Sequence, residues 1–381
     1  MRRPDKKTIT QLSENSTANS VTIYLATHRP GTDYSGDKNR IKLKNQIKEV
    51  KRTLMHRGMK ESDVNQYLEP LYTLEQNTIF LNNLWDGLVV FLSGNTYEYF
   101  VMSEIFDDLV YVGDEFYLLP LLKPLGENID FYILSLALQG VTLYKANRFS
   151  IEKLDVEEFL PQNVENAIGF DYKNRIFQHR ASVSGRGEAM YHGHVRGEEE
   201  RKKDIRKFLH YVDKGLNKVL KGKNEPLIVA SVDYIFSFYQ EITSYKNVHE
   251  KNISESPENE KPGALQVRAW DHVKQRINDK IMKAKKRFDE SKSKSFVIEN
   301  IIPEVNTGKV DTLFVNNDEH VWGKFKAEEN KAIVHDEKEA GDMELINWSA
   351  IHTYLTNGDV YILEPEEMPV KDRPLNALYR Y

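Results

Sequence analysis

The 381-residue sequence contains no cysteine. Disulfide bonds, thiolate zinc sites and a cysteine nucleophile are therefore excluded, and we expect a reducing cytoplasmic location. Long hydrophobic runs are missing too, because the most apolar stretch, FYILSLALQGVTLY, is shorter than the about 20 apolar residues of a membrane-spanning helix. No apolar segment follows the basic, polar start of the sequence, so we expect neither a secretory signal nor a membrane partner.

A strong excess of one charge is also absent. The 58 acidic and 53 basic side chains give a formal net charge of -5, which argues against a wholly basic protein that coats nucleic acid. A local basic face remains compatible with these numbers, because binding follows the arrangement of charges rather than their sum. The chain is longer than one hydrophobic core normally serves, so its length predicts two or three domains.

The first third of the chain has a mixed α/β pattern. SVTIYLA alternates like a strand, and a helix with an apolar stripe is expected from Arg40 to His56. GLVVFLS, YEYFVMS and FYLLPLLKPLGEN follow as further expected strands. Basic residues recur about a turn apart on the other side of the helix, at Arg40, Lys44, Lys48 and Lys51. A solvated helix face is the simpler explanation of this basic stripe.

The middle third contains a hairpin, a glycine-rich segment and a long helix. FYILSLAL and VTLYKA are joined through Gln139-Gly140, which predicts a β-hairpin. After the glycine-rich segment, a long helix is expected from about Glu198, followed by a buried strand in PLIVASV and a helix in DYIFSFYQEIT. Apolar residues at helical spacing predict that one side of the long helix packs on a sheet: Ile205, Phe208, Leu209, Val212, Leu216, Val219 and Leu220.

The last third begins after VHEKNISESPENEKPG, a polar segment with two prolines that indicates a domain boundary. A long charged helix follows it. TLFVN, HVWGKF, KAIVH and DVYILEP are then expected strands, with a helix around INWSAIHTYLTNG. Gly358 is the expected C-terminal stop of that helix.

Metal and nucleotide sites receive little support from motifs. His192 and His194 with upstream His179 and Glu188 offer metal ligands, but the helical H-E-x-x-H spacing is absent, so no metal is predicted. Gly185-Arg186-Gly187 matches only part of a dinucleotide-binding fingerprint, and the sequence has no G-x-x-x-x-G-K-[ST] loop. No cofactor is therefore predicted.

Nucleophilic and metal-dependent hydrolysis remain weaker alternatives. Ser182 and Ser184 have histidines nearby in the sequence, but a G-x-S-x-G elbow is missing. A nuclease with paired carboxylates would use Asp130 and Asp233, both at expected strand edges. Carboxylates at such places are more often turn or cap residues.

Basic residues around the start of the long helix favour contact with a nucleic acid. Glu198, Glu199 and Glu200 occupy its expected first turn, where the helix dipole favours negative charge. Basic residues continue beyond these acids and also precede them. Because cations that meet a phosphate backbone release counterions, this arrangement predicts an RNA-binding surface. Its candidate residues are Arg180, Arg196, Arg201, Lys202, Lys203, Arg206 and Lys207.

Several segments taken together resemble the bacterial relatives of the archaeo-eukaryotic peptide-chain release factors, the lineage that includes the ribosome-rescue factor Pelota. They are SVTIYLATHRPG and RIKLKNQIKEVKRTL, then FYILSLALQGVTLYKANRFS, GHVRGEEERKKDIRKFLHYVDKGLNKVL and PLIVASVDYIFSFYQEITSYKNV, and finally LTNGDVYILEPEEMPVKDRPLNALYRY. The resemblance implies three domains: a divergent α/β domain over 1–127, a ribonuclease-H-like domain over 128–257 and an L7Ae-like domain over 258–381.

In the release factors a Gly-Gly-Gln loop of the middle domain helps water attack the peptidyl-tRNA ester. The matching loop here offers Gly185, Arg186, Gly187 and Glu188 as candidate catalytic residues, and the glutamine is absent. The resemblance implies a ribosome-associated release or rescue factor that binds rRNA or tRNA and hydrolyses peptidyl-tRNA. The alternative is a ribosome- or structured-RNA-binding protein without catalysis.

Overall fold

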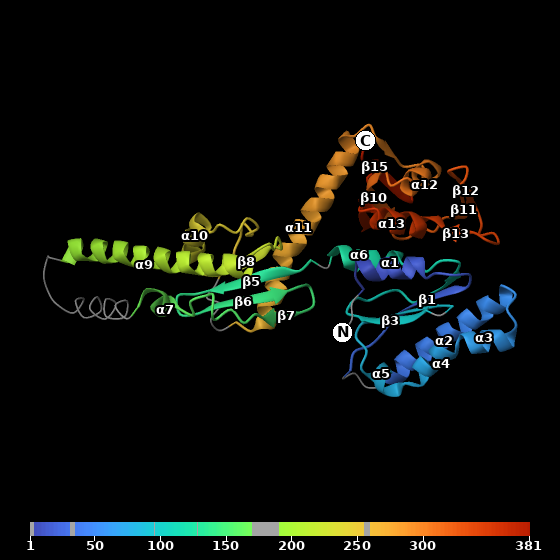
Figure 1. Ribbon diagram of the computed structural model, residues 1–381, viewed down its shortest axis with the longest axis horizontal. Helices are drawn as coiled ribbons and strands as arrows, with labels where there is room; N and C mark the ends of the chain where they lie inside the picture. The colour runs from blue at the N-terminus through green and yellow to red at the C-terminus, as the bar shows by residue number, and fades with distance from the viewer. Residues whose placement is uncertain (1–3, 31–34, 95, 128, 170–189, 255–259) are drawn as a thin grey trace. The chain divides into compact units, whose positions relative to one another are not determined.

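The computed structural model describes residues 4–30, 35–94, 96–127, 129–169, 190–254 and 260–381 (Figure 1). The chain divides into two compact units. One contains Met1–Glu127 together with Lys280–Tyr381, and the other contains Asn128–Asp279. Within the described residues, no helix combines the length and the apolar character needed to cross a bilayer. The predicted mixed α/β class is confirmed, because several sheets alternate with helices.

The N-terminal part of the first unit is built on an antiparallel sheet with the strand order β3-β2-β1-β4. Its elements are α1 (Lys6–Glu14), β1 (Ser20–Ala26), α2 (Ser35–His56), α3 (Glu61–Tyr67), α4 (Glu69–Gln76), α5 (Thr78–Asn82), β2 (Gly87–Ser93), β3 (Thr96–Met102), β4 (Leu109–Gly113) and α6 (Leu119–Glu127). The predicted apolar stripe of α2 is buried against the face of β1 that carries Val21, Ile23 and Leu25. Tyr24 points to the opposite face, which is also buried.

The C-terminal part of the same unit has two small sheets. Strand β10 is parallel to β14 and antiparallel to β15 in the sheet β14-β10-β15-β9, and β12-β11-β13 forms the other sheet. Its elements are β9 (Lys294–Ser295), α12 (Ile298–Asn306), β10 (Val310–Asn316), β11 (Trp322–Lys326), β12 (Lys331–His335), β13 (Met343–Glu344), α13 (Leu345–Leu355), β14 (Asp359–Leu363), the 3-10 helix η2 (Pro365–Glu367) and β15 (Leu375–Tyr379).

These two parts share one hydrophobic core. Phe91, Phe116 and Leu121 from the N-terminal part pack in the same cluster as Leu313 and Ile346 from the C-terminal part. Because both ends of the sequence contribute residues to one core, residues 1–127 and 280–381 form a single compact unit.

The second unit contains a sheet with the order β7-β6-β5-β8, covered on both faces. Its elements are β5 (Phe131–Leu136), β6 (Val141–Ala146), β7 (Ile151–Lys153), α7 (Val164–Ile168), α9 (Met190–Val219), β8 (Leu227–Ala230) and α10 (Asp233–Ile242). Strands β5 and β6 form the predicted antiparallel hairpin, and β8 joins β5 in parallel. Alternate residues of β5 meet α9 and α10 on one face and the start of α11 (Pro262–Glu290) on the other.

The division into compact units differs from the three predicted residue ranges at α11. The first turns of this helix bury Leu265, Ala269 and Val273 in the core of the second unit, whereas Ala284 and Phe288 pack in the first. The boundary at Asp279–Lys280 therefore lies inside a continuous helix rather than at the polar segment before it. Each predicted range still holds a sheet of its own, and the ribonuclease-H-like and L7Ae-like assignments stay predictions.

The polar start of the chain forms α1, whose first turn is capped by Asp5. Three local expectations are corrected by the structure. FYLLPLLKPLGEN, expected as a strand, forms α6. The long helix begins at Met190, eight residues before the expected start, because glycines at 193 and 197 disfavour a helix by only about 1 kcal/mol each. After α13 the left-handed position belongs to Asn357, with φ 63°, and not to Gly358.

Candidate nucleic-acid interface

Part of the predicted site lies outside the described residues. This holds for the candidate loop Gly185, Arg186, Gly187 and Glu188, and for Arg180. Arg196 lies within α9, although only its backbone is described. The remaining candidates, Arg201, Lys202, Lys203, Arg206 and Lys207, follow one another along α9.

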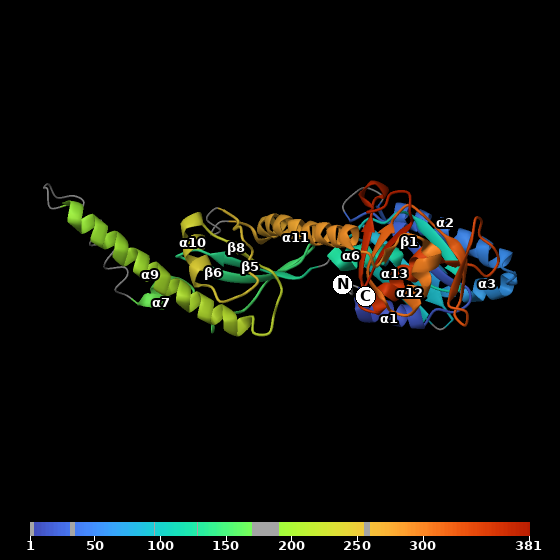
Figure 2. The ribbon, with the colours of Figure 1, turned by 90° about the horizontal axis from the view of Figure 1, so that it is seen from above.

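One side of α9 is anchored to the sheet and to α10, which lies beside it (Figure 2). The buried carboxylate of Asp213 accepts hydrogen bonds from the hydroxyl groups of Thr243 and Ser244 at 3.0 and 2.7 Å. Asn217, one turn later, donates to the hydroxyl of Ser244 at 2.8 Å. At Gly215 an added Cβ would stand 2.1 Å from the carbonyl oxygen of Phe159. These contacts fix the rotation of the helix and leave its other side to solvent.

The solvent side of α9 is basic. Arg201, Lys202, Lys203 and Lys207 are all exposed. No ion pair joins these four side chains to a carboxylate among the residues that the structure describes. Their charges are therefore available to an external anion.

Arg206 differs from its predicted companions. Its guanidinium lies 3.3 Å from a carboxylate oxygen of Glu241 and 4.3 Å from the ring centre of Phe238, both on α10. The side chain therefore holds α9 against α10, and Glu241 neutralises part of its charge. Its predicted role in RNA binding stays untested.

The basic face continues beyond the predicted residues. Lys207, Tyr211, Lys214 and Lys218 are exposed and lie four, three and four positions apart, so they form one row along the helix. Tyr211 keeps 44% of its surface exposed in this row. The three lysines have no ion-pair partner among the described side chains. The helical spacing identifies Lys214 and Lys218 from the sequence, but the exposure of Tyr211 became visible only in the structure.

The basic stripe predicted on α2 is half neutralised. Arg40 pairs with Glu75 at 2.8 Å, and Lys51 pairs with Glu61 at 2.6 Å. Lys44 and Lys48 are exposed and form no ion pair with any side chain in the described part of the chain. Ion pairs on the solvated face of α2 therefore account for two of the four cations, Arg40 and Lys51. As a result, α2 presents a weaker basic surface than α9.

The carboxylates of the nuclease alternative are not brought together. Asp130 precedes β5 and pairs with Lys145 at 2.8 Å, whereas Asp233 follows the carboxyl end of β8 and starts α10. Since β5 and β8 are parallel, the two residues lie beyond opposite ends of the paired strands, which alone span roughly 10 Å. Hydrogen bonds from Ser254 and Asn252 lower the pKa of Asp233. Both aspartates therefore act as local pairing or turn residues.

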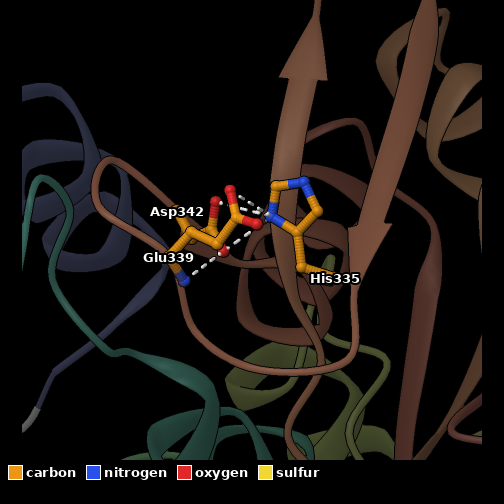
Figure 3. Close-up of side chains that lie close together, drawn as sticks. All are labelled: His335, Glu339 and Asp342. Carbon is orange, nitrogen blue, oxygen red and sulfur yellow. Dashed lines mark hydrogen bonds and ion pairs between the residues drawn. The ribbon is translucent and has the colours of Figure 1, made fainter.

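A different cluster of titratable side chains lies between β12 and β13 (Figure 3). His335 ends β12, and its Nδ1 lies 2.9 Å from Oδ2 of Asp342 and 3.6 Å from Oε2 of Glu339. Burial raises the pKa of Asp342, but the hydrogen bonds from His335 and from the backbone of Glu339 outweigh it, and the net pKa is lowered. No established sequence motif predicts this cluster; its only sequence signal is the H-x-x-x-E-x-x-D spacing.

A family comparison identifies the segment that carries α9. Residues 131–275 match bacterial archaeo-eukaryotic release factor family 7. The predicted resemblance to bacterial relatives of the release factors is confirmed over this segment. All the predicted catalytic and RNA-binding residues fall inside the range matched by the release factor family.

Solved structures similar to this chain include release factors and Pelota proteins. An archaeal translation termination factor is 15% identical, with 100% of this chain and 99% of that chain covered and a TM-score of 0.24. Ribosome-bound archaeal Pelota is 11% identical, with 100% and 95% covered and a TM-score of 0.39. The S. cerevisiae translation termination-like factor Dom34 is 8% identical, with 100% and 94% covered and a TM-score of 0.35. No curated protein matches the sequence.

Proposed function

We propose that this chain is a ribosome-associated factor of the release or rescue type, which contacts rRNA or tRNA through the solvent side of α9. The observation that carries the proposal is the row of exposed cations on that side of the helix, which have no ion-pair partner among the residues that the structure describes. The family match over 131–275 supports a role in translation, because the matched family consists of bacterial relatives of release factors.

The chemistry of the row suits RNA. Lysines one or two turns apart along a rigid helix can meet phosphates along a backbone, and each neutralised phosphate releases a counterion. Tyr211 stands among these lysines and offers an exposed aromatic ring on which an unpaired base can stack. The anchored opposite side of α9 keeps the helix backbone in place, so little backbone conformational freedom is lost on binding.

Sedimentation with purified ribosomes tests this function. The full-length protein should pellet with ribosomes at about 50 mM salt, and binding should weaken steeply by about 200 mM salt. The slope of log affinity against log salt should correspond to several phosphate contacts. Absence of pelleting at the lower salt concentration would contradict ribosome association. Binding that is insensitive to salt would contradict a contact made through phosphates.

Hydrolysis of peptidyl-tRNA is a second candidate function. It is favoured by the position of Gly185–Glu188 inside the matched segment, shortly before α9 in the sequence. Glycine backbone amides can approach the ester closely and stabilise a developing oxyanion without an ionising side chain. Glu188 opposes this reaction, because a carboxylate near RNA phosphates meets electrostatic repulsion.

A release assay separates the two functions. Ribosomes that carry a labelled peptidyl-tRNA should release more peptide with the wild-type protein than with buffer, and Glu188→Gln should increase the rate by removing the repelling charge. Gly187→Val, which adds a bulky branched side chain to the loop, should abolish release and preserve pelleting. If neither wild type nor Glu188→Gln releases peptide under saturating binding, the non-catalytic alternative holds.

A further inference from the structure

Three potential metal ligands lie within one short segment of the first unit. Nδ1 of His335, a carboxylate oxygen of Glu339 and a carboxylate oxygen of Asp342 are all within 4.8 Å of one another. Figure 3 shows the three side chains converging from the end of β12 and the loop that leads to β13. Gly341 adopts a φ of 82°, a left-handed conformation that favours glycine and turns the chain just before Asp342.

The spacing of these atoms fits a small divalent cation. Zinc bonds of about 2.0–2.2 Å to nitrogen and oxygen in a tetrahedral site place neighbouring ligand atoms about 3.3 Å apart. The distances from Nδ1 of His335 to Asp342 and Glu339 are 2.9 and 3.6 Å, one on each side of that value. We propose that His335, Glu339 and Asp342 bind a zinc-class divalent cation, with water as the fourth ligand. An imidazole with two carboxylates is a donor set that such cations accept.

The charges around the cluster set the conditions for binding. The ammonium of Lys324 on β11 lies 3.8 Å from Asp342 and 3.9 Å from Glu339, beyond hydrogen-bond distance of either carboxylate. The side chain of Lys324 is 41% exposed, so it can turn towards solvent when a cation enters. Metal binding also needs the lone pair of Nδ1, so a proton now on this nitrogen leaves to solvent or the ring takes the Nε2–H form.

The cation would fix the conformation of the loop between β12 and β13, which contacts both parts of the first unit. Lys338, one residue before Glu339, lies over Trp322 at 3.9 Å and over Tyr111 of the N-terminal part at 5.5 Å. The rings of Tyr111 and Trp322 are stacked, with 6.3 Å between their centres. A metal bound by residues on both sides of Lys338 would therefore stabilise this stack, which gives the site a structural role.

The simpler explanation is a hydrogen-bonded His–Asp pair that closes the loop without any metal. Calorimetric titration of the full-length protein with Zn²⁺ distinguishes the two explanations. We expect saturable binding of one Zn²⁺ at this site, and Glu339→Gln should weaken its affinity at least about tenfold. Glu339 has a side chain that is 60% exposed, so its replacement is compatible with folding. His210→Ala removes an exposed histidine elsewhere and serves as the matched control, with unchanged Zn²⁺ binding.

Lys324→Met provides a readout that a metal-free His–Asp pair would not produce. Loss of the competing ammonium should increase Zn²⁺ affinity by about tenfold or less, because the ammonium is partly exposed and screened. Zn²⁺ should also raise the thermal unfolding temperature of wild type but not of Glu339→Gln. Equal Zn²⁺ titrations for wild type and Glu339→Gln, or no saturable binding to wild type, would overturn the proposal.

Discussion

At the residue scale, the side chain of Asn347 holds the two parts of the first unit together. Its oxygen accepts hydrogen bonds from the backbone N–H groups of Leu118 and Leu119 at 2.8 and 2.9 Å. Its nitrogen donates to the carbonyl of Phe116 at 3.1 Å. All of these groups are buried, so one amide side chain in α13 caps the start of α6. The contact spans more than 200 positions in the sequence, and a local pattern cannot reveal it.

Replacement of Asn347 by alanine should destabilise the first unit strongly. The change leaves two backbone donors and one backbone acceptor buried without partners, at about 1–3 kcal/mol for each unsatisfied group. We expect a loss of about 3 kcal/mol in the free energy of unfolding, measured by urea denaturation. Asn347→Asp should recover part of the loss, because a carboxylate still accepts from both N–H groups. A loss below 1 kcal/mol for the alanine variant would contradict the capping role.

The carboxyl group of Glu115 should make the stability of the first unit depend on pH. Burial and the neighbouring charge of Asp114 raise its pKa from the usual 4.5 to about 7. At pH values between these two pKa values, the carboxyl group of Glu115 is protonated in the folded state and ionised in the unfolded chain. This stabilising contribution is complete below about pH 4.5 and disappears as the pH rises through about 7.

Glu115→Gln tests this dependence, because glutamine does not titrate. From pH 5 to pH 8 the free energy of unfolding of wild type should fall by about 1–3 kcal/mol more than that of the variant. Histidines whose pKa is lowered by burial, such as His352, act in the opposite direction but are common to both proteins. Parallel pH profiles for the two proteins would show that Glu115 is ionised in the folded state at pH 5.

At the element scale, α9 was the most predictable part of the fold. Six of its seven predicted apolar positions are buried. The local sequence alone predicts them, because apolar residues three and four positions apart lie on one side of a helix. The hairpin β5–β6 and the strand β8 were predictable for the same local reason. Helix α6 was not, because its start depends on Asn347. The cluster around His335 was missed, because the loop between β12 and β13 brings its members together.

A close approach between α9 and the segment at Phe159 explains a glycine inside the helix. A Cβ at position 215 would stand 2.1 Å from the carbonyl oxygen of Phe159 and 2.9 Å from a methyl group of Leu160. Gly215→Ala should therefore destabilise the second unit by about 1–3 kcal/mol, although alanine favours helices over glycine. Thermal unfolding measures this change. Gly222→Ala would be an unsuitable control because its φ is 75°, so Gly140→Ala, with open space around it, is the matched variant.

At the scale of the whole molecule, the two compact units should differ in their ability to fold as fragments. Among the described residues, the hydrophobic clusters of the second unit contain only residues between 129 and 273. A fragment of residues 128–279 should therefore fold alone and unfold in one cooperative transition by circular dichroism. A fragment of residues 1–127 should not, because it exposes the core that it shares with the C-terminal part. A folded 1–127 fragment would contradict the shared core.

We propose that the solvent side of α9 contacts RNA on the ribosome. Ribosome pelleting by the triple variant Lys207→Glu, Lys214→Glu, Lys218→Glu tests it most directly. Lys292→Glu, Lys331→Glu, Lys371→Glu is the matched control, because these exposed lysines lie in the first unit and the change in net charge is the same. The α9 variant should bind at least about tenfold more weakly than wild type, with a salt slope reduced by about three. The control should bind almost as wild type does. Equal binding by both triple variants would contradict the claim.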